Sequence, residues 1–327
     1  MKRRAFISLL GGAAVAWPLG ADAQQPRRVG ALIASHSQTD REGQAIIAAF
    51  LDTFQRLGWT DGRNVRIEYR WGAGDAERTK AAAAELVRSA PDAIVVNSTP
   101  ALAELHRLTT TIPLVFVQVG DPVDSGFVAS LARPGGNITG FQSFEPAMGG
   151  KWLGVLKEAA PNLSRAAVLF GSDAGPTIAF LRAAKAVAPS LGVAVMAIDV
   201  LDDGGMERSV AAFAGQPDGG LVVLPHRYTV AKRGSIIILA ARHRLPATYP
   251  FRVFAAEGGL ISYGFDPVDS WRGAATYVDR ILRGEKPGEL PVQAPTKFEL
   301  VVNLKTARAL GLSIPPAFPL RADEVIE

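Results

Sequence analysis

The spacing of hydrophobic residues from position 28 onward predicts alternating strands and helices. Residues 28–34 form a short apolar run, typical of a buried strand, and residues 39–57 carry apolar side chains at helical spacing. Gly58 marks the end of this helix, because glycine readily adopts the left-handed conformation that follows a last helical turn. Residues 64–71 alternate apolar and polar side chains, which indicates a second strand. Strands that alternate with helices predict a parallel sheet and an α/β fold.

The same pattern continues and then repeats in the second half of the chain. In the first half, we expect helices at 76–89 and 101–108 and strands at 92–97 and 114–119. In the second half, we expect strands at 166–170, 193–199, 220–224 and from Pro246 onward, with helices at 177–191, 206–214 and 229–243. The repeat indicates two doubly wound lobes, which are either one unit built twice or two generic α/β halves that look alike by chance.

The last third of the chain is expected to join these two lobes rather than form a third domain. Its strands at 259–263 and 297–303 and its helices at 268–282 and 304–310 are too few to enclose a core. The chain should then cross between the lobes near 140–145, 249–258 and 284–295, and such crossings form a hinge. The expected N-terminal lobe is 24–142 plus 256–286, and the expected C-terminal lobe is 143–255 plus 287–327.

The first 23 residues have the layout of an export signal. Lys2-Arg3-Arg4 is followed by an apolar run from Ile7 to Leu19 and by the small residues Ala21-Asp22-Ala23 before Gln24. The adjacent arginines resemble a twin-arginine leader, and a general secretory leader fits as an alternative. About 13 apolar residues are fewer than the roughly 20 that span a bilayer. With no cysteine for a lipid anchor, we expect a soluble periplasmic protein after cleavage.

Composition narrows the class of protein. With 327 residues, 48% of them hydrophobic, the chain can fill two ordinary cores. The formal net charge of +4 falls to +2 without the three basic residues and one acidic residue of the leader, which argues against nucleic acid as a partner. The absence of cysteine excludes disulfides and thiolate metal sites. The four histidines lack metal-ligand spacing, and no dinucleotide or phosphate-loop fingerprint occurs, so we expect no metal and no cofactor.

Polar residues follow several predicted strands, where ligands bind in open parallel sheets. Ser98 and Thr99 begin a predicted helix, whose free backbone N–H groups and dipole favour a carboxylate, although both residue types are also common helix caps. Asp121 and Asp173 leave the same two interpretations open. Arg227 is suited to pair with an anionic group, and Tyr228 to stack on a planar ligand, although a solvated loop fits both.

Four segments carry a resemblance to a known family. They are Leu57-Gly58-Trp59-x-x-Gly62-x-Asn64-Val65-x-Ile67-x-Tyr69, Pro113-Leu114-Val115-Phe116 with Gly120-Asp121-Pro122-Val123, Leu131-x-x-Pro134-Gly135-Gly136-Asn137-Ile138-Thr139-Gly140, and Phe298-Glu299-Leu300-Val301-Val302-Asn303. Together they resemble the tryptophan/tyrosine-type substrate-binding proteins of ABC transporters, over about residues 28–311. The resemblance implies a type I periplasmic-binding-protein fold whose two lobes close on one small solute and deliver it to a membrane permease.

The resemblance also implies where the solute contacts the protein. The positions of His36, Ser98, Thr99, Asp121 and Ser172 match the binding loops of the family. Many relatives carry an aspartate, suited to a ligand ammonium, where this chain has Pro225-His226-Arg227-Tyr228. The family implies an amino acid-like solute, whereas this departure favours an aromatic or anionic organic acid. Both classes of solute are therefore kept as expectations. The candidate ligand-binding residues are His36, Ser98, Thr99, Asp121, Ser143, Ser172, Asp173, His226, Arg227, Tyr228, Tyr249 and Arg252.

Two other functions use the same architecture. A sensory receptor for a membrane signalling partner requires the same closure of two lobes. A periplasmic enzyme would use Asp121, Asp173 or His226 as an acid or base. Because no catalytic motif accompanies these residues, we assign no catalytic residue and expect a binding protein, not an enzyme.

Overall fold

Two sheets, one in each lobe, organise the chain. The computed structural model describes residues 25–200 and 202–327, so the expected export signal lies outside the described residues. The first sheet is entirely parallel and has the order β2-β1-β3-β4-β5. Its strands are β1 (Arg27–Ile33), β2 (Val65–Trp71), β3 (Ala93–Asn97), β4 (Leu114–Val119) and β5 (Ile138–Gln142).

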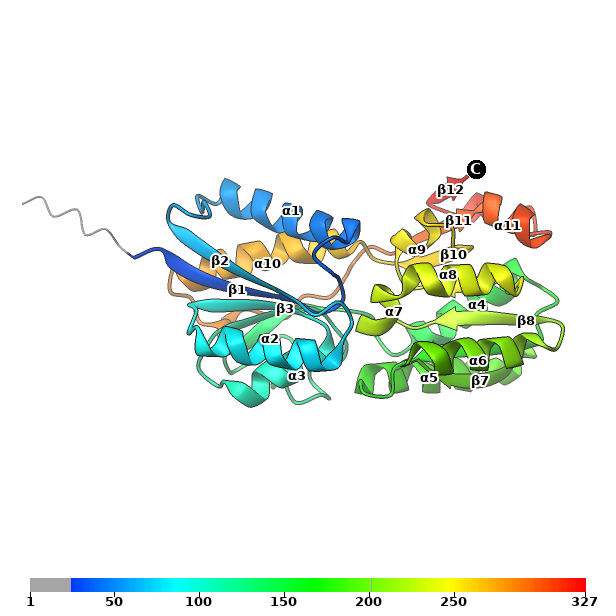
Figure 1. Cartoon of the computed structure of the whole chain (residues 1–327), viewed down its shortest axis with the longest axis horizontal. Helices are drawn as coiled ribbons and strands as arrows, with labels where there is room; N and C mark the ends of the chain where they lie inside the picture. Colours follow the sequence, from blue (N-terminus) through cyan, green and yellow to red (C-terminus); the bar gives the residue numbers. More distant parts are fainter. Residues whose placement is uncertain (1–24, 201) are drawn as a thin grey trace, which may run out of the picture.

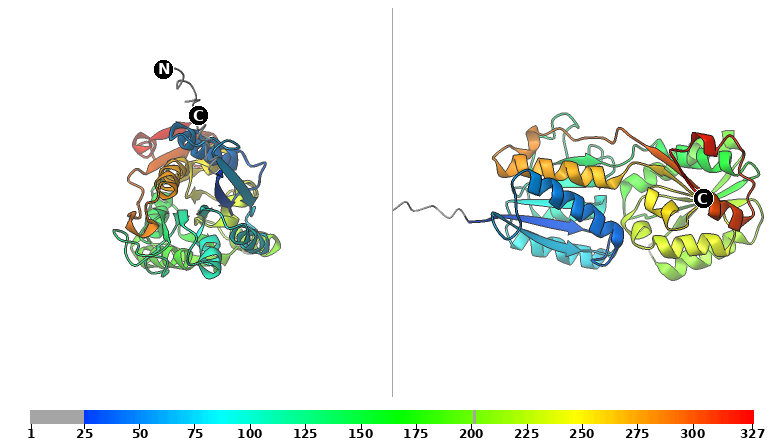
Figure 2. Two further views of the ribbon diagram at one scale, coloured as in Figure 1. Left: turned by 90° about the vertical axis from the view of Figure 1, so that its left-hand side faces the viewer. Right: turned by 90° about the horizontal axis from the view of Figure 1, so that it is seen from above.

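Helices cover both faces of the first sheet, as the continuous apolar strands require. These helices are α1 (Arg41–Arg56), α2 (Ala76–Arg88), α3 (Thr99–Leu108) and α10 (Pro267–Leu282). On one face, Phe50 of α1 and Trp271 of α10 share a core cluster with Val29. On the other face, Leu86 of α2 packs in a cluster with Leu32. The late helix α10 lies beside α1, far from it in sequence (Figure 2).

The second sheet contains seven strands in the order β12-β11-β10-β9-β8-β6-β7. They are β6 (Arg165–Phe170), β7 (Ala194–Asp199), β8 (Gly219–Val223), β9 (Ala247–Tyr249), β10 (Ile261–Gly264), β11 (Glu299–Asn303) and β12 (Glu324–Ile326). Only the β10–β11 pair is antiparallel among the described strands of this sheet. Strands β6 to β10 repeat the order of β1 to β5. The predicted two doubly wound lobes are therefore confirmed, and Figure 1 shows them next to each other.

The helices of the second lobe surround its sheet (Figure 1). They are α4 (Met148–Ala159), α5 (Gly175–Val187), α6 (Asp203–Ala214), α7 (Arg227–Ala231), α8 (Arg233–Arg242), α9 (Arg252–Ala256) and α11 (Leu304–Leu310). The described ranges also contain three short 3-10 helices: η1 (Ala188–Leu191), η2 (Pro287–Glu289) and η3 (Pro319–Arg321). The expected single helix at 229–243 is in fact α7 and α8, which meet at Lys232. None of the helices within the described ranges is both long and apolar enough to cross a bilayer.

The chain crosses between the sheets at places that partly differ from the expected ones. The first crossing joins β5 to α4, within the range expected. The second joins β10 to α10, not residues 249–258, because β9 and β10 pair in one sheet and Gly258, with φ +112°, ends α9. The strand Ile261–Gly264 therefore belongs to the second sheet, although 256–286 was expected in the first lobe. The third crossing follows Gln293, whose N–H donates to the Gly140 carbonyl of the first lobe at 2.9 Å.

Candidate ligand-binding cleft

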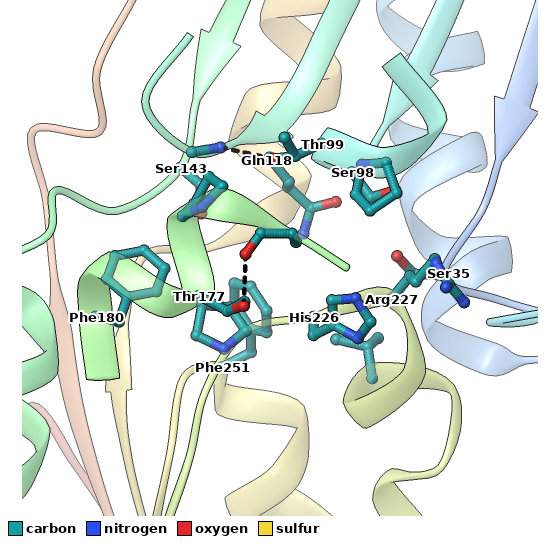
Figure 3. Close-up of a pocket in the computed structure, with 16 residues that line it drawn as sticks. Ser35, Ser98, Thr99, Gln118, Ser143, Thr177, Phe180, His226, Arg227 and Phe251 are labelled. Carbon is teal, nitrogen blue, oxygen red and sulfur yellow. Dashed lines mark hydrogen bonds between the residues drawn. The ribbon is translucent and has the colours of Figure 1, made fainter. Parts of the chain in front are cut away.

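A cleft between the lobes lies at the carboxyl ends of both sheets, where the parallel-sheet rule places a ligand. It encloses about 490 Å³, including its open mouth. Its lining comes from both lobes: Ser35, Ser98, Thr99, Pro100, Gln118, Gly120 and Ser143 from the first, and Ala174, Pro176, Thr177, Phe180, Pro225, His226, Arg227, Val230 and Phe251 from the second. The two walls differ in chemistry, since hydroxyls and an amide form one and aromatic and aliphatic groups much of the other (Figure 3).

The polar wall is held by the ends of the first sheet. Asn97, the last residue of β3, accepts a hydrogen bond from the Ala34 N–H at 2.7 Å and so ties the ends of β1 and β3 together. The N–H of Gly120 donates to Thr99 Oγ1 at 3.2 Å, which joins the end of β4 to the start of α3. Hydrogen bonds between side chains and backbone therefore join neighbouring strand ends in this wall and hold the Thr99 hydroxyl in place.

Two residues of this wall have a strained backbone. Ser98 and Gln118 have φ of +78° and +56°, in the left-handed region that non-glycine residues avoid. Asp121, with φ +45°, lies just beyond the cleft. Such conformations cost about 1–3 kcal/mol each and tend to persist at ligand-binding sites.

The second wall is formed mainly by α5 and the loops after β8 and β9. Phe180 and Phe251 are 2% and 4% exposed, and both rings pack against Phe144 beneath the cleft. Thr177 turns its hydroxyl away from solvent and donates to the Gly171 carbonyl. This wall therefore presents aromatic surface, with few free polar groups, to a ligand.

A charged cluster lies at one end of the second wall. His226 Nε2 is 2.7 Å from Asp173 Oδ1, and Arg227 Nη2 donates to Asp173 Oδ2. Tyr228 N–H donates to His226 Nδ1 at 3.3 Å, so Nδ1 serves as an acceptor and Nε2 is the ring nitrogen beside the carboxylate. Burial alone would raise the pKa of Asp173, but the hydrogen bond and charge of His226, together with Arg227, lower it to about 2. Each carboxylate oxygen of Asp173 thus contacts a neighbouring side chain, Oδ1 that of His226 and Oδ2 that of Arg227.

The two lobes touch across the cleft at three places. Arg227 donates to the Gly74 carbonyl of the first lobe. Arg233 Nη1 and Nη2 lie 2.5 and 3.1 Å from the two carboxylate oxygens of Asp40, which caps α1. Gly120 is so close to Pro176 that an added Cβ would lie 2.6 Å from the proline Cβ. The molecule is therefore in a closed arrangement of its lobes.

The expected site residues divide into those that line the cleft and those that lie elsewhere. Ser98, Thr99, Ser143, His226 and Arg227 line it. His36 is buried beside the lobe contact, Asp121 accepts from the Asp124 N–H at 3.3 Å in a turn, and Ser172 is exposed. Asp173 and Tyr228 line a separate hollow outside the cleft.

Tyr249 and Arg252 are placed away from the cleft, contrary to expectation. Tyr249 is 1% exposed and stacks on Phe254 with ring centroids 5.0 Å apart. Arg252 forms two hydrogen bonds of 2.6 Å with Glu324 and is not among the residues that line the cleft. Phe180, which lines the cleft, was not among the predicted site residues, because a helical phenylalanine carries no signal that distinguishes a cleft wall from a core.

His36 gives a testable pH dependence. It is 2% exposed, and neither ring nitrogen has a hydrogen-bond partner among the described residues. Burial lowers the pKa of His36 to about 4, with Asp40 opposing this effect and Arg233 adding to it. From pH 6.5 to 4, the unfolded chain therefore binds a proton that the folded protein does not. We expect the free energy of unfolding to fall by at most about 3 kcal/mol as the pH drops through this window.

Urea unfolding at pH 7 and pH 4.5 measures this effect. The variant His36→Gln should lose less stability between the two pH values than the wild type, because glutamine does not titrate. The control His106→Gln, at an exposed histidine, should keep the wild-type pH dependence. Equal losses in wild type and His36→Gln would mean that His36 does not cause the effect.

Comparisons with known proteins agree with this architecture. A curated relative is the tyrosine-binding protein of Clostridioides difficile (strain R20291), 23% identical over 89% of this chain and 83% of that protein. The fold is similar to an ABC domain from Streptococcus pneumonia solved in complex with L-Trp, at TM-score 0.82 and 24% identity over 92% of this chain and all of that one. It is also similar to the ligand-free, open structure of a substrate-binding protein with adhesive properties from Clostridium difficile, at TM-score 0.62 and 21% identity over 92% of this chain and 99% of that one.

The family assignment covers nearly the whole described chain. Residues 32–326 match the family described as ABC transporter substrate binding protein, so the match includes every residue that lines the cleft and every strand except the first five residues of β1. The resemblance inferred from the four sequence segments is therefore confirmed, and the chain belongs to the ABC transporter substrate-binding protein family.

Proposed function

We propose that this protein is the periplasmic substrate-binding component of an ABC importer. It binds one small organic solute between its lobes and delivers the closed complex to a membrane permease. The proposal includes cleavage of the export signal expected at residues 1–23 and a location outside the cytoplasm. In this proposal, the first sheet and the helices that cover it form the N-terminal lobe. The second sheet and the helices around it form the C-terminal lobe.

The observation that carries the proposal is a cleft built by both lobes at the carboxyl ends of both sheets. Each wall is incomplete without the other, so a ligand that contacts both walls stabilises the closed arrangement over the open one. The three chain crossings supply a hinge on which such closure can occur. Neither Asp173 nor Asp121 lines the cleft, which favours binding over acid–base chemistry.

Native mass spectrometry of the protein purified from periplasm, followed by denaturing release, tests the proposal. We expect one small molecule per chain. Small-angle scattering of the protein before and after removal and return of that molecule should show a more compact bound form. A bound molecule that is chemically converted during incubation, or a proven ligand that causes no compaction, would contradict the proposed mechanism.

A further inference from the structure

The charge of the cleft lining restricts the chemistry of the ligand. Among the 16 residues that line the cleft in the described chain, one is an arginine, one is a histidine and none is an aspartate or glutamate. An ammonium group buried in this cleft would therefore meet no lining carboxylate. Burying a charge without a partner is costly, so the lining disfavours a ligand that carries an ammonium group.

The carboxylate beside the cleft cannot serve as that partner. Asp173 directs Oδ1 to His226 Nε2 at 2.7 Å and Oδ2 to Arg227 Nη2, so both oxygens are occupied. A ligand ammonium would have to displace one of these partners and leave it buried without a counter-charge. His226 and Arg227 are only 6% and 5% exposed, which makes that exchange unfavourable.

Two polar groups that can donate hydrogen bonds belong to lining residues and lack partners. Ser98 Oγ and Arg227 Nε are buried and have no hydrogen-bond partner within the described ranges, and both residues line the cleft. Ser98 precedes the ten-residue helix α3, and its side chain makes no capping bond. The start of this helix has positive electrostatic character, so a carboxylate that accepts from the Ser98 hydroxyl would be stabilised there.

We infer that the ligand is a small organic acid that carries a carboxylate and an apolar or aromatic group but no ammonium group. This inference rests on the proposed function, because it assumes that a solute binds in the cleft. The carboxylate faces Ser98 and the start of α3 in the first lobe. The apolar group lies toward Phe180 and Phe251 in the second lobe (Figure 3).

Calorimetry on ligand-free protein with matched compounds tests the inference. Each set shares one carbon skeleton and contains the acid, its primary amide and the α-amino acid, such as 3-phenylpropanoate, 3-phenylpropanamide and L-phenylalanine. Phenol, indole and isobutyl skeletons complete the panel. For the skeletons that bind, we expect the acid to bind at least tenfold more tightly than the amide and the amino acid. Tighter binding of an amino acid or an amide, or no binding by any of the four acids, would overturn the inference.

A serine variant tests the position of the carboxylate. Ser98→Ala should weaken binding of the acid about tenfold and change binding of the matched amide less. Ser262→Ala is the control, because Ser262 is also buried with an unpartnered hydroxyl but lies in β10, outside the cleft lining. Equal affinities of wild type and Ser98→Ala for the acid would overturn the assigned position. Thermal unfolding of both variants verifies that they fold.

Failure of this inference and failure of the proposed function give different results. If the periplasmic protein carries an amino acid and compacts around it, the ligand class is wrong and the proposed function stands. If no small molecule is carried and none in a broad thermal-shift screen stabilises the protein, the proposed function fails and the inference fails with it.

Discussion

Replacing Arg233 by methionine is expected to weaken ligand binding roughly 150- to 5000-fold. Arg233 bridges Asp40 of the first lobe and Glu257 of the second, with Nε 2.9 Å from Glu257 Oε2. The side chains of Arg233 and Asp40 are only 10% and 11% exposed. Removing one partner of a buried ion pair costs about 3–5 kcal/mol, because the remaining charge stays buried without its partner. In an open arrangement water solvates Asp40, so this cost falls on the closed form and therefore on affinity.

Titration calorimetry with the ligand released from the periplasmic protein measures the loss, and small-angle scattering measures closure. Arg321→Met serves as the matched control, because the Arg321–Glu158 pair is 64% and 50% exposed and such pairs contribute about 0–1 kcal/mol. Wild-type affinity in Arg233→Met would show that this ion pair does not stabilise the closed form.

The variant Asp40→Asn separates the charge of Asp40 from its role in capping α1. Asp40 accepts hydrogen bonds from the N–H groups of Glu42 and Gly43, and asparagine caps a helix about as well. Combined with Arg233→Met, Asp40→Asn should restore most of the lost affinity, because the uncompensated carboxylate is gone. If the double variant binds as weakly as Arg233→Met alone, the loss comes from the packing of the arginine stem rather than from charge.

Local patterns were enough to predict the two parallel α/β lobes and the end of the sheets that forms the cleft. Ser98 and Thr99 were identified because strand β3 and the start of α3 are both visible in a short stretch of sequence. The rule that ligands bind at the carboxyl ends of parallel strands then placed them without knowledge of the second lobe.

Pairs that form between distant parts of the chain could not be predicted in this way. Asp40 and Arg233 are 193 positions apart, and in sequence they are an ordinary helix cap and an ordinary helical arginine. Arg252 follows a strand end and so resembled a ligand contact, but Glu324, 72 positions later, binds it away from the cleft. Tyr249 is enclosed by the stacking of Phe254, which depends on how α9 folds back on its strand. These outcomes are set by tertiary packing.

Gly120→Ala is expected to weaken ligand binding about 10- to 100-fold by preventing full closure. An added Cβ would lie 2.6 Å from Pro176 Cβ and 3.0 Å from its Cγ, and the proline ring cannot rotate away. Gly120 lies outside the left-handed region, so its backbone accepts alanine. The cost of such a clash is about 1–3 kcal/mol, and it arises only where the two lobes meet.

Scattering and calorimetry distinguish this mechanism from a direct clash with the ligand. Gly136→Ala is the control, because an added Cβ there has no neighbour within 4 Å, and it should close and bind like the wild type. Gly120→Ala should keep the thermal stability of the ligand-free protein but compact less when ligand is added. Adding Pro176→Gly to Gly120→Ala removes the opposing ring, so affinity should recover relative to Gly120→Ala if lobe contact is the cause. A double variant that binds no better than Gly120→Ala would assign the loss to the ligand itself, since only a contact across the lobes depends on both residues.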